Sequence, residues 1–401
     1  MNYSRNSGMK GKRTTEIAKS ESVRLHPLAD VVLRTQYGIS SELADSGTMP
    51  CLRMNNLRGG RIVLEDLKYS HLDPAKLKPY KLNKEDIIFN RTNSSSLVGK
   101  CAIFKEDAIV VFASYLVRVV PDKKHIDPDY LIQLLCSEFW QSKIQAMATK
   151  GVSQSNINIK NLLRLRIPIP SLVRQERIAA ILQYFDQIQE LTESLHNQSK
   201  VIQSALMQQL LLPTPKTRSK FKVRSLGELF AERKESGKVG LPTLSVTMHD
   251  GMVDREEHGR RVASELTPEE HLLARKHDIA YNMMRMWQGV SGLAPYDGLV
   301  SPAYVVLKPL RGIDPLFASY LFKLPETIRL FHRYSQGLTN DRLRLYYDQF
   351  AEIRVPIPTD IAEQKRIARL LSTFDQHIEQ SETLVTALRQ TKAAICQKLF
   401  T

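Results

Sequence analysis

A polar loop follows an apolar, strand-like run in the first half of the chain and carries side chains that can bind the edges of nucleic-acid bases. The loop residues are Asn90, Arg91, Thr92, Asn93 and Ser94. Arginine can donate two hydrogen bonds to guanine, and asparagine can pair with adenine in a similar bidentate way. An ordinary hairpin turn uses the same residue types. The loop therefore has two equally good interpretations, a base-binding segment and a structural turn.

Three more groups of polar side chains are candidates for contacting a nucleic acid. Two groups lie beside glycines in matching places of the two halves, and we expect them to contact phosphates rather than bases. These are Lys150, Gln154, Ser155 and Asn156 in the first half, and Asn340, Arg342 and Arg344 in the second. The third group is Asn282, Arg285, Trp287 and Gln288. Trp287 is equally compatible with a place in the hydrophobic core.

No catalytic, cofactor-binding or metal-binding residue is predicted. The chain has no Walker phosphate loop and no glycine-rich turn after a strand. The segment Asp127-Pro128-Asp129-Tyr130 is similar to the Asp-Pro-Pro-Tyr loop of amino-methyltransferases, but it lacks the second proline, and we interpret it as a helix start. Glu232-Arg233-Lys234 could end a nuclease carboxylate motif, yet no suitably placed Pro-Asp precedes it. The four cysteines show no paired spacing and are interpreted as buried thiols.

The composition indicates a soluble globular protein with more than one domain. The chain has 401 residues, of which 42% are hydrophobic and 25% charged. No apolar run approaches the ~20 residues that span a bilayer, and the N-terminus has no apolar signal segment. We therefore predict a cytoplasmic protein with no membrane partner.

The net charge of +15 is unevenly distributed along the chain. Basic and acidic side chains balance over residues 171–212 and 359–401 taken together, so the excess lies elsewhere. It lies in the two globular domains, in the N-terminal arm 1–22 and in the basic linker 213–222. Such a distribution is typical of a protein that binds a polyanion such as DNA. A generic solubilising charge is the alternative.

A twelve-residue segment occurs twice and organises the chain. Residues 175–186 read QERIAAILQYFD and residues 364–375 read QKRIARLLSTFD, with seven identical positions. Each copy follows a strand-like run with alternating prolines and begins a long helix. The repeat predicts two related units, which divide the chain into a basic arm (1–22), a first domain (23–170), a central helical region (171–212), a linker (213–222), a second domain (223–358) and a C-terminal helical region (359–401).

Each predicted long helix carries apolar residues at three-and-four spacing, which is typical of a coiled-coil partner. In the first helix the seam residues are Ile178, Leu182, Phe185, Ile188, Leu195, Ile202 and Leu206. In the second they are Ile367, Leu371, Phe374, Ile378, Leu384, Leu388 and Ile395. Two separate amphipathic helices, each lying on its own domain, are the alternative. We predict an α+β protein in which two α/β domains are joined by two long antiparallel coiled-coil helices, with an internal pseudo-two-fold repeat.

This order resembles the specificity subunits, HsdS, of type I restriction–modification systems. The resemblance rests on the two junctions, Ile167–Pro170 before Gln175 and Val355–Pro358 before Gln364, and on the run from Asp86 to Lys100. The second domain departs from the family pattern after Asn282. The resemblance implies a non-catalytic subunit that reads a bipartite DNA site, one half per target-recognition domain.

The resemblance also implies the partners of the chain. These are double-stranded DNA, two modification subunits that methylate adenine with S-adenosylmethionine, and restriction subunits that translocate and cleave DNA; this chain itself binds no cofactor. Two other classes of function stay open on the residues alone: a self-contained DNA-modifying enzyme and a structural coiled-coil adaptor.

Overall fold

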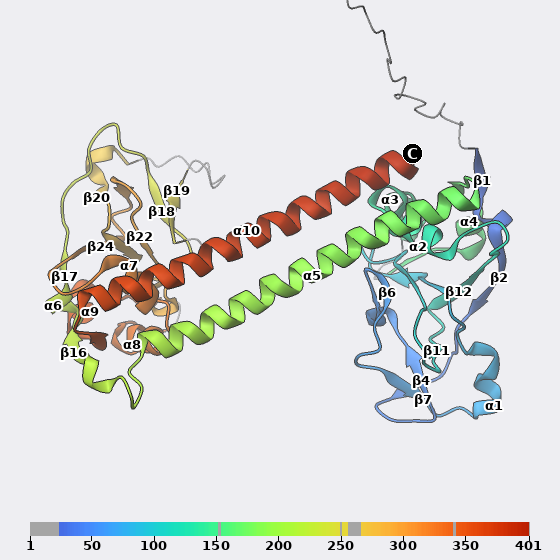
Figure 1. Cartoon of the computed structure of the whole chain (residues 1–401), viewed down its shortest axis with the longest axis horizontal. Helices are drawn as coiled ribbons and strands as arrows, with labels where there is room; N and C mark the ends of the chain where they lie inside the picture. Colours follow the sequence, from blue (N-terminus) through green and yellow to red (C-terminus); the bar gives the residue numbers. More distant parts are fainter. Residues whose placement is uncertain (1–23, 151–153, 249–250, 256–265, 340–341, 401) are drawn as a thin grey trace, which may run out of the picture. The chain divides into compact units, whose positions relative to one another are not determined.

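The structure is a computed structural model that describes residues 24–150, 154–248, 251–255, 266–339 and 342–400 (Figure 1). The predicted basic arm 1–22 lies outside the described residues. The chain divides into two compact units, Met1–Leu191 with Val385–Thr401, and Thr192–Leu384. Each unit therefore contains one α/β domain and one end of each long helix.

A six-stranded sheet forms the centre of the first unit. Its strands, in order across the sheet, are β2 (Val32–Tyr37), β12 (Leu116–Pro121), β8 (Ile87–Asn90), β10 (Cys101–Ile103), β6 (Gly60–Ile62) and β5 (Leu57–Arg58). Successive side chains of β8 alternate between the two faces, so Ile87 and Phe89 join one hydrophobic core while Ile88 joins another. The apolar run before the polar loop is thus a strand buried on both faces.

Smaller elements surround this sheet. A second sheet has the order β11 (Val111–Phe112), β4 (Met49–Leu52), β7 (Lys68–Ser70) and β3 (Leu43–Ala44). The helices are α1 (Pro74–Leu77), α2 (Pro128–Cys136), α3 (Glu138–Ala146) and α4 (Ile159–Leu163). The side chain of Asp127 accepts a hydrogen bond from the Tyr130 N–H at 2.7 Å, so this segment starts a helix as predicted. Cys51, Cys101 and Cys396 are buried as predicted, whereas Cys136 is half-buried.

The second unit repeats the strand order. Its main sheet has the order β17 (Phe230–Glu232), β24 (Tyr304–Pro309), β21 (Ile279–Asn282) and β22 (Ser291–Leu293), all antiparallel. The remaining strands pair as β18 (Leu244–Val246) with β19 (Met252–Asp254) and β20 (Leu272–Ala274) with β23 (Gly298–Val300), and the helices are α6 (Leu226–Leu229), α7 (Pro315–Leu321), α8 (Pro325–Tyr334) and α9 (Tyr347–Glu352). The main sheet corresponds to β2-β12-β8-β10 of the first unit, which confirms the predicted internal repeat.

The proline-containing strands close each domain. In the first unit β15 (Arg166–Pro168) pairs antiparallel with β1 (Leu25–Pro27), and in the second β25 (Arg354–Pro358) pairs with β16 (Phe221–Ser225). Each pair is a sheet of only two strands. Proline is tolerated there because a strand with one partner leaves N–H groups outside the ladder. Both chain ends of a domain therefore meet where its long helix begins.

The repeated segment is the part of each helix that packs on its domain. In the first unit Ile178, Ala179 and Leu182 of α5 (Leu172–Leu211) enter the domain core. In the second unit Ile367, Ala368 and Leu371 of α10 (Ile361–Phe400) occupy the same places. Each core also receives the far end of the other helix, through Cys396 and Phe400 in the first unit and Leu211 in the second. These contacts explain why the Arg-Ile-Ala-x-x-Leu pattern recurs.

A buried glutamine fixes each helix to its domain with the same three hydrogen bonds. Gln175 accepts the Asp127 N–H at 2.8 Å and donates to the carbonyls of His125 at 3.1 Å and Pro170 at 2.8 Å. Gln364 accepts the Asp314 N–H at 2.8 Å and donates to the carbonyls of Gly312 at 3.1 Å and Pro358 at 2.8 Å. Both side chains are fully buried.

Replacing Gln175 with leucine should loosen this junction, because one N–H and two carbonyls are left unpaired in a buried place. A buried polar group without its partner costs about 1–3 kcal/mol, so we expect local unfolding to become at least tenfold easier. Hydrogen exchange of residues 125–128 and 168–176 in the full chain measures this effect. The neighbouring exposed Glu176→Ala is the matched control, and equal exchange in the two variants would contradict a structural role for Gln175.

The two long helices are antiparallel in each unit. In the first unit Lys392 forms an ion pair with Asp186. In the second unit His196 Nδ1 lies 2.7 Å from Ser381 Oγ, and Gln203 donates to Asp375 at 2.5 Å. As the residue number rises along α5 (green in Figure 1), that of the partner on α10 (red) falls.

The helix seam differs from the prediction at three positions. Most of the predicted seam residues are buried or half-buried: Ile178, Leu182, Phe185, Ile188, Leu206, Ile367, Leu371, Phe374, Ile378, Leu388 and Ile395. Leu195, Ile202 and Leu384 are instead 54%, 50% and 50% exposed. The less exposed positions between Ile188 and Leu206 are polar and include Thr192, His196, Ser199 and Gln203. The packing keeps its three-and-four spacing, and the apolar residues used for the prediction lie on an adjacent row.

Candidate nucleic-acid interface

The two polar segments predicted in the first half of the chain are neighbours in the fold. A three-stranded sheet has the order β13 (Thr149–Lys150), β14 (Ser155–Asn156) and β9 (Thr92–Asn93). Its register pairs Ser155 with Asn93 and Asn156 with Thr92, and the Ile157 N–H donates to the Arg91 carbonyl at 2.8 Å. Backbone pairing thus brings the loop after β8 against the hairpin that precedes α4.

The side chains of this first cluster contact one another. Arg91 Nη1 donates to Asn156 Oδ1 at 3.3 Å, and Thr92 Oγ1 donates to the same oxygen at 3.3 Å. The Arg91 guanidinium lies 5.1 Å from the ring centroid of Tyr37, at the end of β2. Tyr37 was missed by the sequence analysis, because nothing in its local sequence connects it with a loop more than fifty residues away.

The remaining candidates of the first domain differ in accessibility. Gln154, Asn156 and Ser94 are exposed, whereas Ser155 is buried. Asn93 donates to the Met54 sulfur at 3.3 Å and caps the Ser94 N–H at 2.8 Å. Asn90 is fully buried, so a base edge cannot reach it in this conformation, and its side chain has no partner among the described residues. Lys150 ends β13, and its side chain lies outside the described part of the chain.

The second domain brings its two polar segments together in the same way. The Leu345 N–H donates to the Met283 carbonyl at 3.0 Å, and Gln336 and Arg344 form a two-stranded bridge. A hollow of about 610 Å³ opens beside them. It is lined by Met284, Gln336, Gly337, Leu338, Arg342, Arg344 and Tyr346. The predicted Arg342 and Arg344 therefore share one hollow with exposed apolar and aromatic side chains that the sequence analysis did not select.

The loop after β21 is partly fixed by its own side chains. Asn282 Oδ1 accepts the Met284 N–H at 2.9 Å. Trp287 is half-buried, donates to the Met284 carbonyl at 3.0 Å and packs edge-on against His332 at 5.8 Å. Arg285 and Gln288 are exposed. Trp287 thus shapes this loop, and the predicted Asn340 lies outside the described residues.

The two clusters occupy equivalent places. Ile157 and Leu345 are both fully buried, and each donates its N–H to the loop that follows the central strand. Counting back from these residues, Arg342 and Arg344 stand where the first domain has Gln154 and Asn156. The frame is repeated while the polar side chains on it differ, as expected for loops that carry different specificities on one scaffold.

The family assignment comes from sequence and structure comparison. The family model described as "Type I restriction modification DNA specificity domain" matches residues 18–200 and 276–389. The chain belongs to this family. Within it, the chain is 29% identical to the putative type I restriction enzyme MjaX specificity subunit of Methanocaldococcus jannaschii over 54% of this chain and 52% of that one. It is 30% identical to the type I restriction enzyme StySPI specificity subunit of Salmonella potsdam over 33% of this chain and 28% of that one.

The fold is also that of a specificity subunit. The S subunit of the type I restriction–modification system from M. genitalium superposes with a TM-score of 0.63 and 16% identity, covering 96% of this chain and 98% of that one. At this identity the similarity concerns the fold alone. The matched segment spans about half the length of the M. jannaschii relative.

The cations of the specificity domains fall into two groups. Many are paired with acids, including Arg53 with Asp66, Lys68 with Asp45 and Lys105 with Asp129. In contrast, Arg91, Arg285, Arg342 and Arg344 have no acidic partner among the residues that the structure describes. Their charge is therefore available to an anionic ligand.

No described group of three or more His, Cys, Asp or Glu side chains could hold a metal ion, and no described helix is long and apolar enough to cross a membrane. The residues of the possible nuclease motif have structural contacts. Arg233 is buried and donates to Asp278 at 2.6 Å, and Lys234 pairs with Glu232 at 3.0 Å. Burial also raises the pKa of the Cys51 thiol to about 12, which makes it a poor nucleophile.

Proposed function

We propose that this chain is a non-catalytic subunit that recognises a bipartite sequence in double-stranded DNA, one half-site per domain, in the cytoplasm. The observation that carries the proposal is the pair of equivalent clusters around Arg91 and Arg344. Each combines arginine side chains that have no acidic partner among the described residues with amide side chains at the end of the central strand of its own domain. Such side chains bind phosphates and base edges, and their different composition fits two different half-sites.

We further propose that the chain recruits modification subunits, which bind S-adenosylmethionine and methylate adenine, and restriction subunits, which translocate and cleave DNA. Exposed apolar side chains on the long helices support a protein partner. In the first unit Ile181, Tyr184 and Leu191 of α5 are 50%, 64% and 63% exposed, at the spacing of one helix face. In the second unit the exposed Leu195 and Ile202 of α5 continue the same spacing.

The experiment is a binding selection from randomised duplex DNA with the chain assembled with its modification subunits. We expect two short conserved blocks separated by unselected positions. Affinity should fall steeply with salt, with a log–log slope of about −0.9 per phosphate contacted. A flat salt response or an unenriched pool would refute DNA recognition. Methyl transfer to DNA by the purified chain alone would instead identify it as a self-contained enzyme.

A further inference from the structure

We propose that Arg91 reads a guanine in the half-site bound by the first domain, and that Tyr37 and Asn156 position it for this task. The inference rests on the proposed function and adds one base and three residue roles to it. Arg91 is the specificity-determining residue, while the other two residues act through its guanidinium group.

The guanidinium is held in place before any ligand binds. It lies over the Tyr37 ring at 5.1 Å, and its Nη1 donates to Asn156 Oδ1 at 3.3 Å. These contacts come from β2 and β14, two elements distant in sequence, so both the plane and the reach of the group are set by the fold. Its Nε is buried without a partner among the described residues. Nη1 carries a second N–H, and this donor together with those of Nη2 remains free at the outer end of the group.

A fixed and planar donor pair suits guanine better than phosphate. Guanine offers the acceptors O6 and N7 side by side in the major groove, and arginine is its commonest partner. Phosphate oxygens also accept this fork, but a phosphate contact carries no sequence information and is made as well by the mobile ammonium group of a lysine. Holding a long side chain in one orientation reduces the entropy lost on binding. This restraint increases selectivity where the orientation of the donors decides which base is bound.

The neighbouring candidates are less available for this role. Thr92 donates to Asn156, Asn93 bonds with Met54 and Ser94, and Asn90 is fully buried. Arg91 is thus the cation of the loop with free donors at its accessible end.

The second domain supports the assignment independently. The Ile157 N–H bonds to the Arg91 carbonyl in the first domain, and the Leu345 N–H bonds to the Met283 carbonyl in the second. Met283 therefore corresponds to Arg91, and Arg344, just before Leu345, corresponds to Asn156. At this backbone pairing each domain therefore has an arginine, which comes from the first segment in one domain and from the second segment in the other. In the second domain Arg344 lines a hollow that Tyr346 also lines.

The test uses the chain assembled with its modification subunits and the selected wild-type DNA site. In that site we expect an invariant guanine in the half governed by the first domain. Replacing this base with 7-deazaguanine removes the N7 acceptor and should weaken wild-type binding about tenfold, with no change in the protein. Arg91→Lys keeps the charge but loses the planar fork, so it should lose the preference for guanine at that one position by about ten- to a hundredfold.

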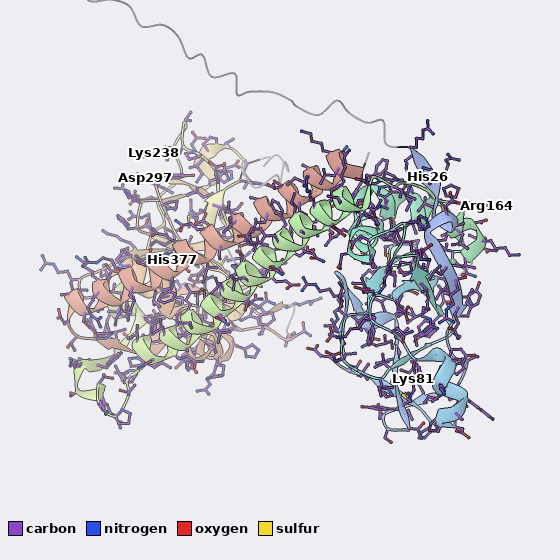
Figure 2. All side chains as sticks on the ribbon, turned by 45° about the vertical axis from the view of Figure 1, so that its right-hand side comes forward. His26, Lys81, Arg164, Lys238, Asp297 and His377 are labelled. Carbon is purple, nitrogen blue, oxygen red and sulfur yellow. The ribbon has the colours of Figure 1, made fainter. Side chains whose placement is uncertain are left out.

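Matched controls separate positioning from general charge. Arg164→Gln removes a positive charge from the same domain at an exposed place after α4 (Figure 2) and should leave the base preference unchanged. Tyr37→Phe keeps the ring and should behave like wild type, whereas Tyr37→Ala and Asn156→Ala should reduce guanine preference at the same position only.

Two results would overturn the assignment. In the first, the Arg91→Lys variant shows the same base preference as wild type at every position of the site, which would make Arg91 a phosphate contact. In the second, 7-deazaguanine has no effect at any guanine of that half-site. Both leave a wild-type complex that still selects a bipartite site, so they are distinguishable from failure of the proposed function, in which wild type selects no sequence.

Discussion

Replacing Arg118 with methionine should destabilise the first domain by about 3–5 kcal/mol, because it leaves a buried carboxylate without its cation. Arg118 is 1% exposed, and its Nη1 lies 3.3 Å from Asp86 Oδ2. The guanidinium also donates to the Lys81 carbonyl at 2.7 Å and to Gln36 Oε1 at 2.5 Å. These contacts join β12 to β2 and to the residue that precedes β8, so the loss should extend across the sheet that supports the Arg91 loop.

The stability lost in the Arg118→Met variant should increase as the pH rises. Burial raises the pKa of the Asp86 carboxyl above its ordinary value, even though Arg118 partly offsets this effect. Without Arg118 the pKa rises further. Above the unfolded value of about 3.9, the unfolded chain has released this proton while the folded variant still holds it. The folded state then binds more protons, so its stability falls as the pH rises through this window.

Hydrogen exchange of β8 and β12 peptides in the full chain is the appropriate measurement, since a chain with two units need not unfold in one step. Arg164→Met is the matched control, because Arg164 is an exposed arginine of the same domain after α4. Asp86→Asn combined with Arg118→Met should recover much of the lost protection. An Arg118→Met penalty that is small and independent of pH would show that the pair contributes little.

The second domain has a comparable pair built from a different strand. Asp278 follows the left-handed residue His277, as Asp86 follows Glu85, and both of these residues have φ of 73°. Its partner Arg233 comes from the end of β17, where the first domain supplies its cation from β12. The buried aspartate occupies the same position in both domains, but its arginine partner comes from a different strand in each. Aligning the two halves by sequence therefore does not match the two arginines.

The sequence predicted the architecture well because the repeat is used twice for the same purpose. The Arg-Ile-Ala-x-x-Leu pattern recurs where two domain cores must receive a helix, and apolar side chains at that spacing leave few alternatives. The roles of Gln175 and Gln364 could not be predicted, since an isolated glutamine does not indicate which backbone groups it will bond.

The seam shows where apolar pattern alone is insufficient. Leu195, Ile202 and Leu384 continue an apolar period, yet the paired helices keep their register with His196, Ser381 and Gln203. Hydrogen bonds between polar side chains compensate for their burial, and the apolar side chains of Leu195, Ile202 and Leu384 stay exposed. A protein partner could cover these exposed apolar side chains, so that one row of each helix contacts the other helix and the adjacent row contacts the partner. Sequence periodicity alone cannot tell which of the two rows forms the helix–helix contact.

The candidate interface was predicted as separate loops, and only the fold joins them. Strand register pairs Asn156 with Thr92 and so brings Asn156 within reach of Arg91, 65 residues away in sequence. Tyr37 enters through the tertiary structure alone. Residue type identified the possible base-binding side chains, but their orientation and mutual contacts depend on the tertiary structure.

Exchanging the first domain for that of a relative should replace one half of the DNA target and leave the other unchanged. The exchanged segment should run from residue 25 to residue 168, because β1 and β15 are paired strands and a boundary between them would split a sheet. The incoming domain must keep a backbone N–H equivalent to that of Asp127, which donates to Gln175, and an apolar surface for Ile178, Leu182 and Phe400. If the new domain keeps these features, it can pack on α5 and α10 as the original domain does.

The expected effect is large because a wrong base pair costs about 1–3 kcal/mol and separate positions add. With three changed base pairs the hybrid complex should prefer its new site over the old one by at least a hundredfold, and methylated positions should follow in the assembled enzyme. The reciprocal exchange of residues 221–358 should change the other half. If either exchange altered both halves, base recognition would depend on contacts shared between the domains, and the equivalent clusters around Arg91 and Arg344 could not be independent recognition sites.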